Sequence, residues 1–382
     1  MKILQLLPAE AFHGGEIATY RLSNELLKMG MEVVVVTSPG LKDGFSRLHA
    51  TATYVLPEHS GRLPRRMYTY LKMTVSLRRI LSRERPDVVH VQAKLARLLM
   101  LVSGRHQVIV ETLHGVGLAK GEAFQRAVNR ISDLLAAASF DEFISVSKTS
   151  RGRLSFFGAP MRYIPNSIDG TEFKFVPLNG KEKLVIFVGR LTEVKRPLFF
   201  VEAIGMIRPF LAQLGIQVKM IGDGPLEEAV RQAIKRLGLE ASISLEGYLG
   251  NEEVRDCMAR AYAYVTCSIT EGMSLALLEA MASGCVVIAS SIPANRDVIQ
   301  NEKTGLLFNG GDTAELAGLI KRVFQEPTAA TALAANARAD FESNYDAREN
   351  SLAIVEVYKE AVNSGGRSTP GGSGAGGKHG RA

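Results

Sequence analysis

The segment from residue 271 to residue 284, EGMSLALLEAMASG, decides the fold of this chain. It follows the apolar run Val265-Thr266-Cys267, which is typical of a buried strand, and a second apolar run occupies residues 286–290. Residues 274–283 between them are rich in leucine and alanine and predict a helix. A strand, a turn, a helix and a second strand make a βαβ unit, so we expect the two strands to be parallel.

The same alternation occupies most of the 382 residues, in two blocks. Residues 33–36 and 108–110 are continuously apolar, as in strands that helices cover on both faces. We therefore expect an α/β fold of two Rossmann-like, doubly wound domains that face a central cleft. Strands are predicted at residues 2–8, 31–38, 87–92, 107–113, 142–147, 162–165, 184–189, 218–222, 242–246, 262–267 and 286–290, and helices at 17–29, 124–138, 197–214, 225–237, 252–261, 274–283, 313–325 and 347–362.

Composition indicates where the domains end. Residues 1–169 form the first expected domain and residues 184–345 the second. Residues 170–183 lack periodicity and contain two glycines and a proline, which is typical of a linker. A last helix is expected within residues 346–363, and the Gly- and Ser-rich residues 364–382 are expected to be a disordered tail without a catalytic role.

Charge is distributed unevenly along the chain. Residues 1–180 contain 24 basic and 15 acidic side chains, whereas the remainder contains 22 and 24, so the first half carries the whole positive excess. This imbalance indicates an anionic partner: a phosphorylated acceptor, an anionic lipid surface or a nucleic acid. No apolar run approaches the roughly 18 residues of a membrane helix, residues 1–8 predict a strand and not a signal peptide, and the three cysteines form no C-x-x-C pair. These features favour a cytoplasmic protein.

Ligands of doubly wound domains bind beyond the carboxyl ends of the strands, and the second domain has polar motifs there. Glu271 begins the turn after one strand, and Glu279 lies eight residues later, on a helix whose N-terminus offers unpaired N–H groups to an anion. Arg190 and Lys195 follow another strand and can both face a diphosphate. Gly222, in a Gly-Asp-Gly-Pro sequence, indicates either part of a nucleotide pocket or a structural turn.

Two further motifs end strands of the first domain. His13-Gly14-Gly15 follows the first strand, where paired glycines let the backbone lie against phosphate or sugar, or form a tight turn. His114 ends a later strand, where a histidine either faces the cleft or serves as a hydrogen-bonded structural residue.

These five motifs, in the order in which they occur along the chain, resemble those of the retaining GT-B glycosyltransferases of family four, and the resemblance covers residues 2–362. It implies transfer of a sugar from a UDP- or GDP-sugar to a hydroxyl acceptor, lipid-linked or anionic, in the synthesis of a polysaccharide, glycolipid or other glycoconjugate. It also implies that the helix within residues 346–363 crosses back to the first domain. We expect a monomer or a weak dimer.

The resemblance assigns catalytic roles to four residues. Arg190 and Lys195 would neutralise the donor diphosphate, and Glu271 and His114 would contact the transferred sugar. It also assigns donor-binding roles. Glu279 would bind the ribose, and Gly272, Met273 and Ser274 would form the loop at the phosphates. Gly15 and Gly222 are the glycines at strand ends, and Tyr248 and Leu249 lie at the strand end that contacts the base. Ser274 stands where many members have glycine, and residues 292–297 depart from the commoner glycine-rich form.

No Asp-x-Asp motif occurs in the sequence, although many transferases use one to hold a metal. We therefore expect no metal and no other cofactor, with Arg190, Lys195 and the helix N-terminus at Ser274 stabilising the departing diphosphate. No side chain stands out as a covalent nucleophile, so the resemblance implies retention by front-face attack.

Other functions remain as alternatives. An NAD-dependent oxidoreductase would need G-x-G-x-x-G after the first strand, where this chain has AEAFHGG. A nucleotide-sugar epimerase and a non-catalytic nucleotide-sugar-binding homologue share the same fold. No nucleic-acid motif accompanies the basic half, so we expect no nucleic-acid partner.

Residues 62–85 predict a helix with a basic face. One side is expected to carry Arg65, Lys72, Arg79 and Arg83, and the opposite side Met67, Leu71, Thr74 and Leu81. Such a helix either packs on the sheet with a solvated basic face or makes peripheral contact with an anionic membrane, which would be the inner face of the cell membrane.

Overall fold

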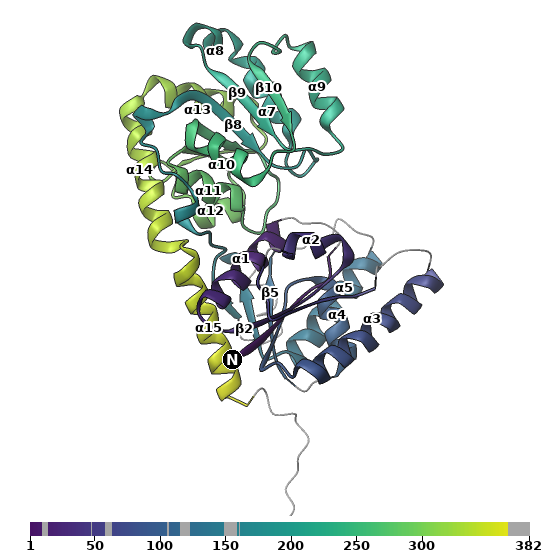
Figure 1. Cartoon of the computed structure of the whole chain (residues 1–382). Helices are drawn as coiled ribbons and strands as arrows, with labels where there is room; N and C mark the ends of the chain where they lie inside the picture. Colours follow the sequence, from purple (N-terminus) through teal and green to yellow (C-terminus); the bar gives the residue numbers. More distant parts are fainter. Residues whose placement is uncertain are drawn as a thin grey trace, which may run out of the picture.

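The structure is a computed structural model that describes residues 1–9, 14–46, 48–57, 63–104, 107–114, 123–148, 159 and 161–365; side chains 63–66 and 123–128 are not described. Two parallel sheets, each with helices on both faces, form two domains joined by a pair of long C-terminal helices (Figure 1). The predicted fold class is confirmed. Residues 366–382 of the predicted disordered tail, and His13 of the first glycine motif, lie outside the described residues.

The first domain is built on a seven-stranded parallel sheet with the order β3-β2-β1-β4-β5-β6-β7. Its strands are β1 (Lys2–Leu7), β2 (Glu32–Thr37), β3 (Ala52–Val55), β4 (Val88–Val91), β5 (Val108–Leu113), β6 (Glu142–Ser145) and β7 (Met161–Tyr163). The connecting helices are α1 (Gly14–Lys28), α2 (Lys42–Phe45), α3 (Leu63–Glu84), α4 (Lys94–Ser103) and α5 (Ala123–Ser139). Apolar side chains of α3, α4 and α5 pack on one face of the sheet, and those of α1 on the other.

The second domain repeats this plan with six parallel strands in the order β10-β9-β8-β11-β12-β13. They are β8 (Glu182–Val188), β9 (Gln217–Ile221), β10 (Ile243–Gly247), β11 (Ala261–Thr266), β12 (Val286–Ser290) and β13 (Leu306–Phe308). Its helices are α7 (Pro197–Met206), α8 (Arg208–Leu214), α9 (Glu227–Arg236), α10 (Asn251–Arg260), α11 (Leu275–Ser283), α12 (Pro293–Val298), α13 (Thr313–Gln325) and α14 (Pro327–Asn344). The opening βαβ unit is β11, α11 and β12, and β11 and β12 are parallel, as predicted.

Several elements differ from the sequence prediction. The helix expected at residues 197–214 breaks into α7 and α8, which are bent by 70°. Pro209 lacks the N–H that would continue the helix, and its ring crowds the preceding turn. The structure also has strands β3 and β13, at residues where the sequence pattern predicts none.

The C-terminal helices connect the domains. Helix α14 packs on the second domain, and α15 (Ala347–Asn363) runs down along the first (Figure 1). Val355, Val357 and Tyr358 of α15 are buried in the core that α1 forms with the first sheet. No single helix in the described part of the chain has both the length and the apolar character of a membrane span. The bent pair α7–α8, taken together, is long and apolar enough for one by length and composition alone.

Candidate functional site

The second sheet reverses its strand order between β8 and β11, and such a switch point is where open α/β sheets bind ligands. The loop after β8 carries Lys195, and the loop after β11 carries Glu271. Lys195 Nζ donates a hydrogen bond to Glu271 Oε1, and Ser268 Oγ donates to the same oxygen over 2.6 Å. Ile269 N also donates to Val194 O over 2.9 Å, which joins the two loops through the backbone. Two predicted site residues therefore meet at the switch point.

Gly222 holds the Lys195 loop in place. Its φ is +131°, and a Cβ there would lie 2.1 Å from Gly189 O, so no other residue fits without moving the backbone. Gly224 similarly faces Leu191, whose N–H donates to Asp223 O over 2.7 Å. The side of Gly222 where a side chain would project is thus occupied by protein. Of the two roles that the sequence left open, this geometry favours the structural turn.

Helix α11 begins beside the Lys195–Glu271 pair. Ser274 is its N-cap, and the Ser274 hydroxyl accepts a hydrogen bond from Leu277 N over 3.4 Å. The serine that replaces the family's glycine therefore caps the helix and leaves its backbone extended, with φ −77° and ψ 119°. Gly272 and Met273 form the loop that leads into this N-terminus, where the helix dipole and N–H groups favour an anion.

Glu279 is engaged in a contact that the sequence did not predict. Arg21 of α1 donates from Nη2 to Glu279 Oε1 over 2.9 Å, although the two residues belong to different domains. Both side chains are about 15% exposed, so the pair is mostly removed from water. Glu279, to which the resemblance assigns the ribose hydroxyls of the donor, is thus paired with a cation of the opposite domain.

Arg190, Tyr248 and Leu249 follow the carboxyl ends of β8 and β10, two strands that β9 separates in the sheet. Arg190 is exposed directly after β8. Tyr248 is 76% exposed after the edge strand β10, where its ring is available for stacking, and Leu249 is partly buried.

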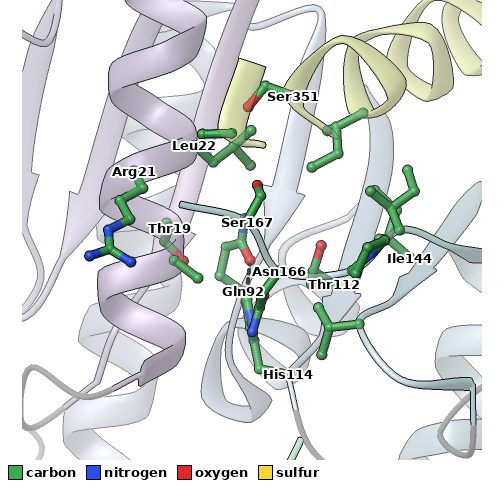
Figure 2. Close-up of a pocket in the computed structure, with 16 residues that line it drawn as sticks. Thr19, Arg21, Leu22, Gln92, Thr112, His114, Ile144, Asn166, Ser167 and Ser351 are labelled. Carbon is green, nitrogen blue, oxygen red and sulfur yellow. Dashed lines mark hydrogen bonds between the residues drawn. The ribbon is translucent and has the colours of Figure 1, made fainter. Parts of the chain in front are cut away.

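In the first domain, His114 and Gly15 lie against each other. His114 directly follows β5, Gly15 is the second residue of α1, and a Cβ on Gly15 would lie 3.3 Å from His114 Cγ. The glycine motif therefore makes room for the histidine ring. His114 Nε2 bonds to Gln92 Oε1 over 2.7 Å, and the two side chains meet in a narrow cavity (Figure 2).

A buried chain of hydrogen bonds continues from His114. Gln92 Nε2 donates to Gln5 Oε1 over 2.9 Å and contacts His90 Nδ1 over 3.1 Å, and His90 Nδ1 contacts the Tyr358 hydroxyl of α15 over 2.6 Å. His90 is fully buried, which lowers its pKa to about 3 and keeps it neutral.

This chain determines the tautomer of His114. Because the amide nitrogen of Gln92 donates to Gln5 and His90, its oxygen is the acceptor that faces His114. With this orientation of the Gln92 amide, His114 Nε2 carries the proton, and burial, which lowers the His114 pKa to about 4, keeps the ring neutral. Nδ1 is then an acceptor; among the described residues it is a buried atom without a hydrogen-bond partner. A sugar hydroxyl is a suitable donor to it.

The cavity around His114 is small. It measures about 40 Å³, which holds about three water molecules, and Arg21 turns away from it (Figure 2). A nucleotide-sugar does not fit within this volume.

Comparison with known families agrees with this geometry. The chain matches the family Glycosyl transferases group 1 over residues 169–340 and the family Glycosyltransferase Family 4 over residues 12–172. The chain belongs to the family-four glycosyltransferases. It is a glycosyltransferase with the GT-B fold, as the sequence predicted.

Individual relatives of this glycosyltransferase are distant. It is 29% identical to a glycogen synthase of Mycobacterium tuberculosis, over 72% of this chain and 69% of the relative. It is 25% identical to the Escherichia coli UDP-Gal:alpha-D-GlcNAc-diphosphoundecaprenol alpha-1,3-galactosyltransferase, over 66% of this chain and 70% of the relative. Among solved structures, Anabaena HepE in complex with UDP-glucose has a TM-score of 0.80 at 18% identity, covering 94% of this chain and 100% of that one.

Sequence reasoning missed several residues that join the domains of this glycosyltransferase. Asp297, in the segment that departs from the family pattern, accepts from Ser147 Oγ over 3.0 Å and from Lys148 N over 2.8 Å. Asn166 Nδ2 donates to Met273 O over 3.3 Å and so ties the first domain to the phosphate loop. These partners are far apart in sequence, so no local pattern predicts that they meet. Their position after a strand is the one signal that could have identified them as candidate site residues.

Proposed function

We propose that this glycosyltransferase uses a UDP- or GDP-sugar as donor and transfers the sugar, with retention and without a metal ion, to a hydroxyl of a lipid-linked or anionic acceptor. The observation that carries the proposal is the contact between Lys195 and Glu271 at the switch point, beside the N-terminus of α11. A nucleoside diphosphate laid across this point meets a cation, a helix dipole and a carboxylate within one loop cluster.

Charge stabilisation accounts for the chemistry. Cleavage of the sugar–phosphate bond leaves negative charge on the diphosphate, and in this proposal Lys195, Arg190 and the N–H groups of α11, which follow β8 and β11, bind that charge. Glu271 holds Lys195 Nζ and accepts from the sugar hydroxyls, and His114 Nδ1 accepts from another hydroxyl when the domains enclose the donor. In front-face attack, the leaving phosphate oxygen accepts the proton of the acceptor hydroxyl.

The acceptor is proposed from two observations. The positive excess lies in the first half of the chain, which forms the first domain. The printed name of the Escherichia coli relative specifies a diphosphoundecaprenol-linked acceptor. An acceptor of this class is anionic and membrane-bound, and we propose that the protein acts at the cytoplasmic side of the membrane.

A donor screen tests the proposal. Purified protein is incubated with UDP- and GDP-sugars and scored by thermal stabilisation and by nucleotide release with and without acceptor lipid, in excess EDTA and in magnesium. The correct donor at 100 times its dissociation constant adds about 2.7 kcal/mol of stability. Transfer that EDTA abolishes and magnesium restores would overturn metal independence, and nucleotide-sugar interconversion without acceptor would identify an epimerase. The anomeric configuration of the first product, read by NMR, decides retention.

A further inference from the structure

Nine of the eighteen large apolar side chains that are exposed in the described part of the chain lie on α3, α4 and α5. These three helices lie side by side on one face of the first sheet (Figure 1). A third or more of each of the following side chains is exposed: Met67, Tyr68, Leu71 and Val75 on α3, Leu98 and Val102 on α4, and Ile131, Leu134 and Leu135 on α5. We call these nine residues the apolar face. A soluble surface rarely gathers so many apolar side chains without a binding role.

Part of this face corrects the sequence prediction for residues 62–85. Thr74 and Leu81 are buried against the sheet as expected, but Met67 and Leu71 are 69% and 61% exposed. The stripe that packs on the sheet is instead formed by Met73, Leu77, Ile80 and Leu81. The apolar residues at 67 and 71 are therefore not required for the core, and they share the outer surface with Lys72 and Arg79.

The charge on the same helices has a single sign at the surface. The exposed charged side chains that the structure describes on them are all basic: Lys72, Arg78, Arg79, Arg83, Lys94 and Arg130. The only two carboxylates of these helices are engaged inside the protein. Glu84 binds Lys2 over 2.7 Å and also contacts Tyr54, and the buried Asp133 binds Arg97.

We propose that the apolar face and its surrounding cations form the surface by which the protein docks on an anionic lipid bilayer. Apolar side chains enter the boundary between head groups and acyl chains, while lysine and arginine contact the lipid phosphates. A second copy of this chain is a poorer partner, since a two-fold contact through this face would oppose cations of like sign. The cations favour an anionic partner, and the apolar side chains favour one with an apolar interior.

The topology relates this surface to the cleft. Each of the three helices follows a parallel strand and runs back beside the sheet, so its first turns lie near the carboxyl ends of the strands. Met67, Tyr68 and Leu71 on the early turns of α3, and Leu98 on the early turns of α4, are thus the part of the apolar face nearest the carboxyl ends of the strands. A bilayer against these turns would hold a lipid-linked acceptor close to His114. This step rests on the proposed function, whereas the docking itself does not.

Vesicle flotation without donor or acceptor tests the docking. The full chain is mixed with phosphatidylcholine vesicles that contain either no anionic lipid or about 40% phosphatidylglycerol, which gives the surface a strong negative charge. The wild type is expected to float with anionic vesicles at low salt, and less at high salt. The variant Lys72→Ser/Arg79→Ser/Arg130→Ser is expected to bind roughly 100-fold more weakly at low salt. Leu71→Ser/Val102→Ser/Ile131→Ser is expected to bind roughly tenfold more weakly at both salt concentrations.

Matched controls separate this surface from net charge and general stickiness. Arg231→Ser/Lys235→Ser/Arg236→Ser removes the same charge from α9 of the second domain, and Met206→Ser removes an equally exposed apolar side chain from α7. Both should float like the wild type. The proposal would be overturned if the α9 control lost as much vesicle binding as the basic triple variant, or if the wild type did not float. It would also be overturned if the wild type formed dimers that the apolar triple substitution dissociates. Sugar transfer to a water-soluble acceptor should be unchanged in the triple variants, so failure of docking and failure of the proposed function are distinguishable.

Discussion

Arg21 and Glu279 form an ion pair across the cleft: Nη2 of the arginine on α1 lies 2.9 Å from Oε1 of the glutamate on α11. If Glu279 binds the ribose of the donor, as the family resemblance implies, the ribose hydroxyls have to take over the place of Arg21. The pair therefore links donor binding to the relative position of the two domains. Arg21 also lies 5.9 Å from the ring of Phe173, which gives the displaced guanidinium a neighbouring contact.

We expect Arg21→Met to loosen the contact between the two domains in the absence of donor. The variant keeps the stem of the side chain but removes the charge that holds Glu279. Small-angle scattering should then give a larger radius of gyration than for wild type without donor, and the same radius with saturating donor. Arg208→Met, on α8 and far from the cleft, is the control. Equal radii for wild type and Arg21→Met without donor would show that the pair does not hold the domains.

Removal of either cation after β8 should slow transfer strongly while the fold survives. Lys195→Ala and Arg190→Ala each remove a charge that we propose binds the departing diphosphate, a loss that typically lowers kcat by roughly 100- to 1000-fold. Lys235→Ala on α9 is the matched control and should retain full activity. Full turnover in Lys195→Ala or Arg190→Ala would remove the assigned diphosphate role from that residue.

The arrangement of strands could be predicted from the sequence because it depends on local patterns. Continuous apolar runs predict buried parallel strands, and polar motifs after these runs predict one ligand edge. Lys195 and Glu271 meet for this reason, although they are 76 residues apart. No comparable local signal predicts that Arg21 meets Glu279, because that contact depends on how one domain is oriented against the other.

The outward face of α3 shows a second reason why the sequence does not predict every feature of the structure. Its apolar residues occur on more than one side of the helix, so the period alone does not tell which side packs on the sheet. Positions 73, 77, 80 and 81 are buried because they face β-strand side chains, and this became visible only in three dimensions. The same holds for the chain from His114 to Tyr358, whose members come from β1, β4, β5 and α15.

Protonation of His90 should destabilise the protein as the pH falls. Its folded pKa of about 3 is below the ordinary value of 6.5, so the unfolded state binds more protons between these values. The contribution of His90 is complete above pH 6.5 and decreases as the pH falls toward 3, by about 2 kcal/mol at pH 5. Urea unfolding at pH 7.5 and pH 5 should therefore show a smaller pH effect in His90→Gln than in wild type. The exposed His49→Gln should behave like wild type, and an equal pH effect in all three proteins would contradict the buried neutral state.

Two adjacent glycines allow the placement of His114 to be tested without touching it. A Cβ on Gly15 would lie 3.3 Å from His114 Cγ, so the ring has to shift by a few tenths of an ångström, whereas a Cβ on Gly14 meets nothing within 4 Å. Both residues lie in the first turn of α1, where alanine suits a helix better than glycine. We expect Gly15→Ala to lower kcat by roughly tenfold, since small misplacements of a contacting group are costly, and Gly14→Ala to remain near wild type. The thermal midpoints of both variants should stay close to that of the wild type, which separates an effect on the histidine from unfolding. Equal activity of the two variants would mean that the position of His114 does not matter for transfer, and its Nδ1 would then have no role toward the sugar.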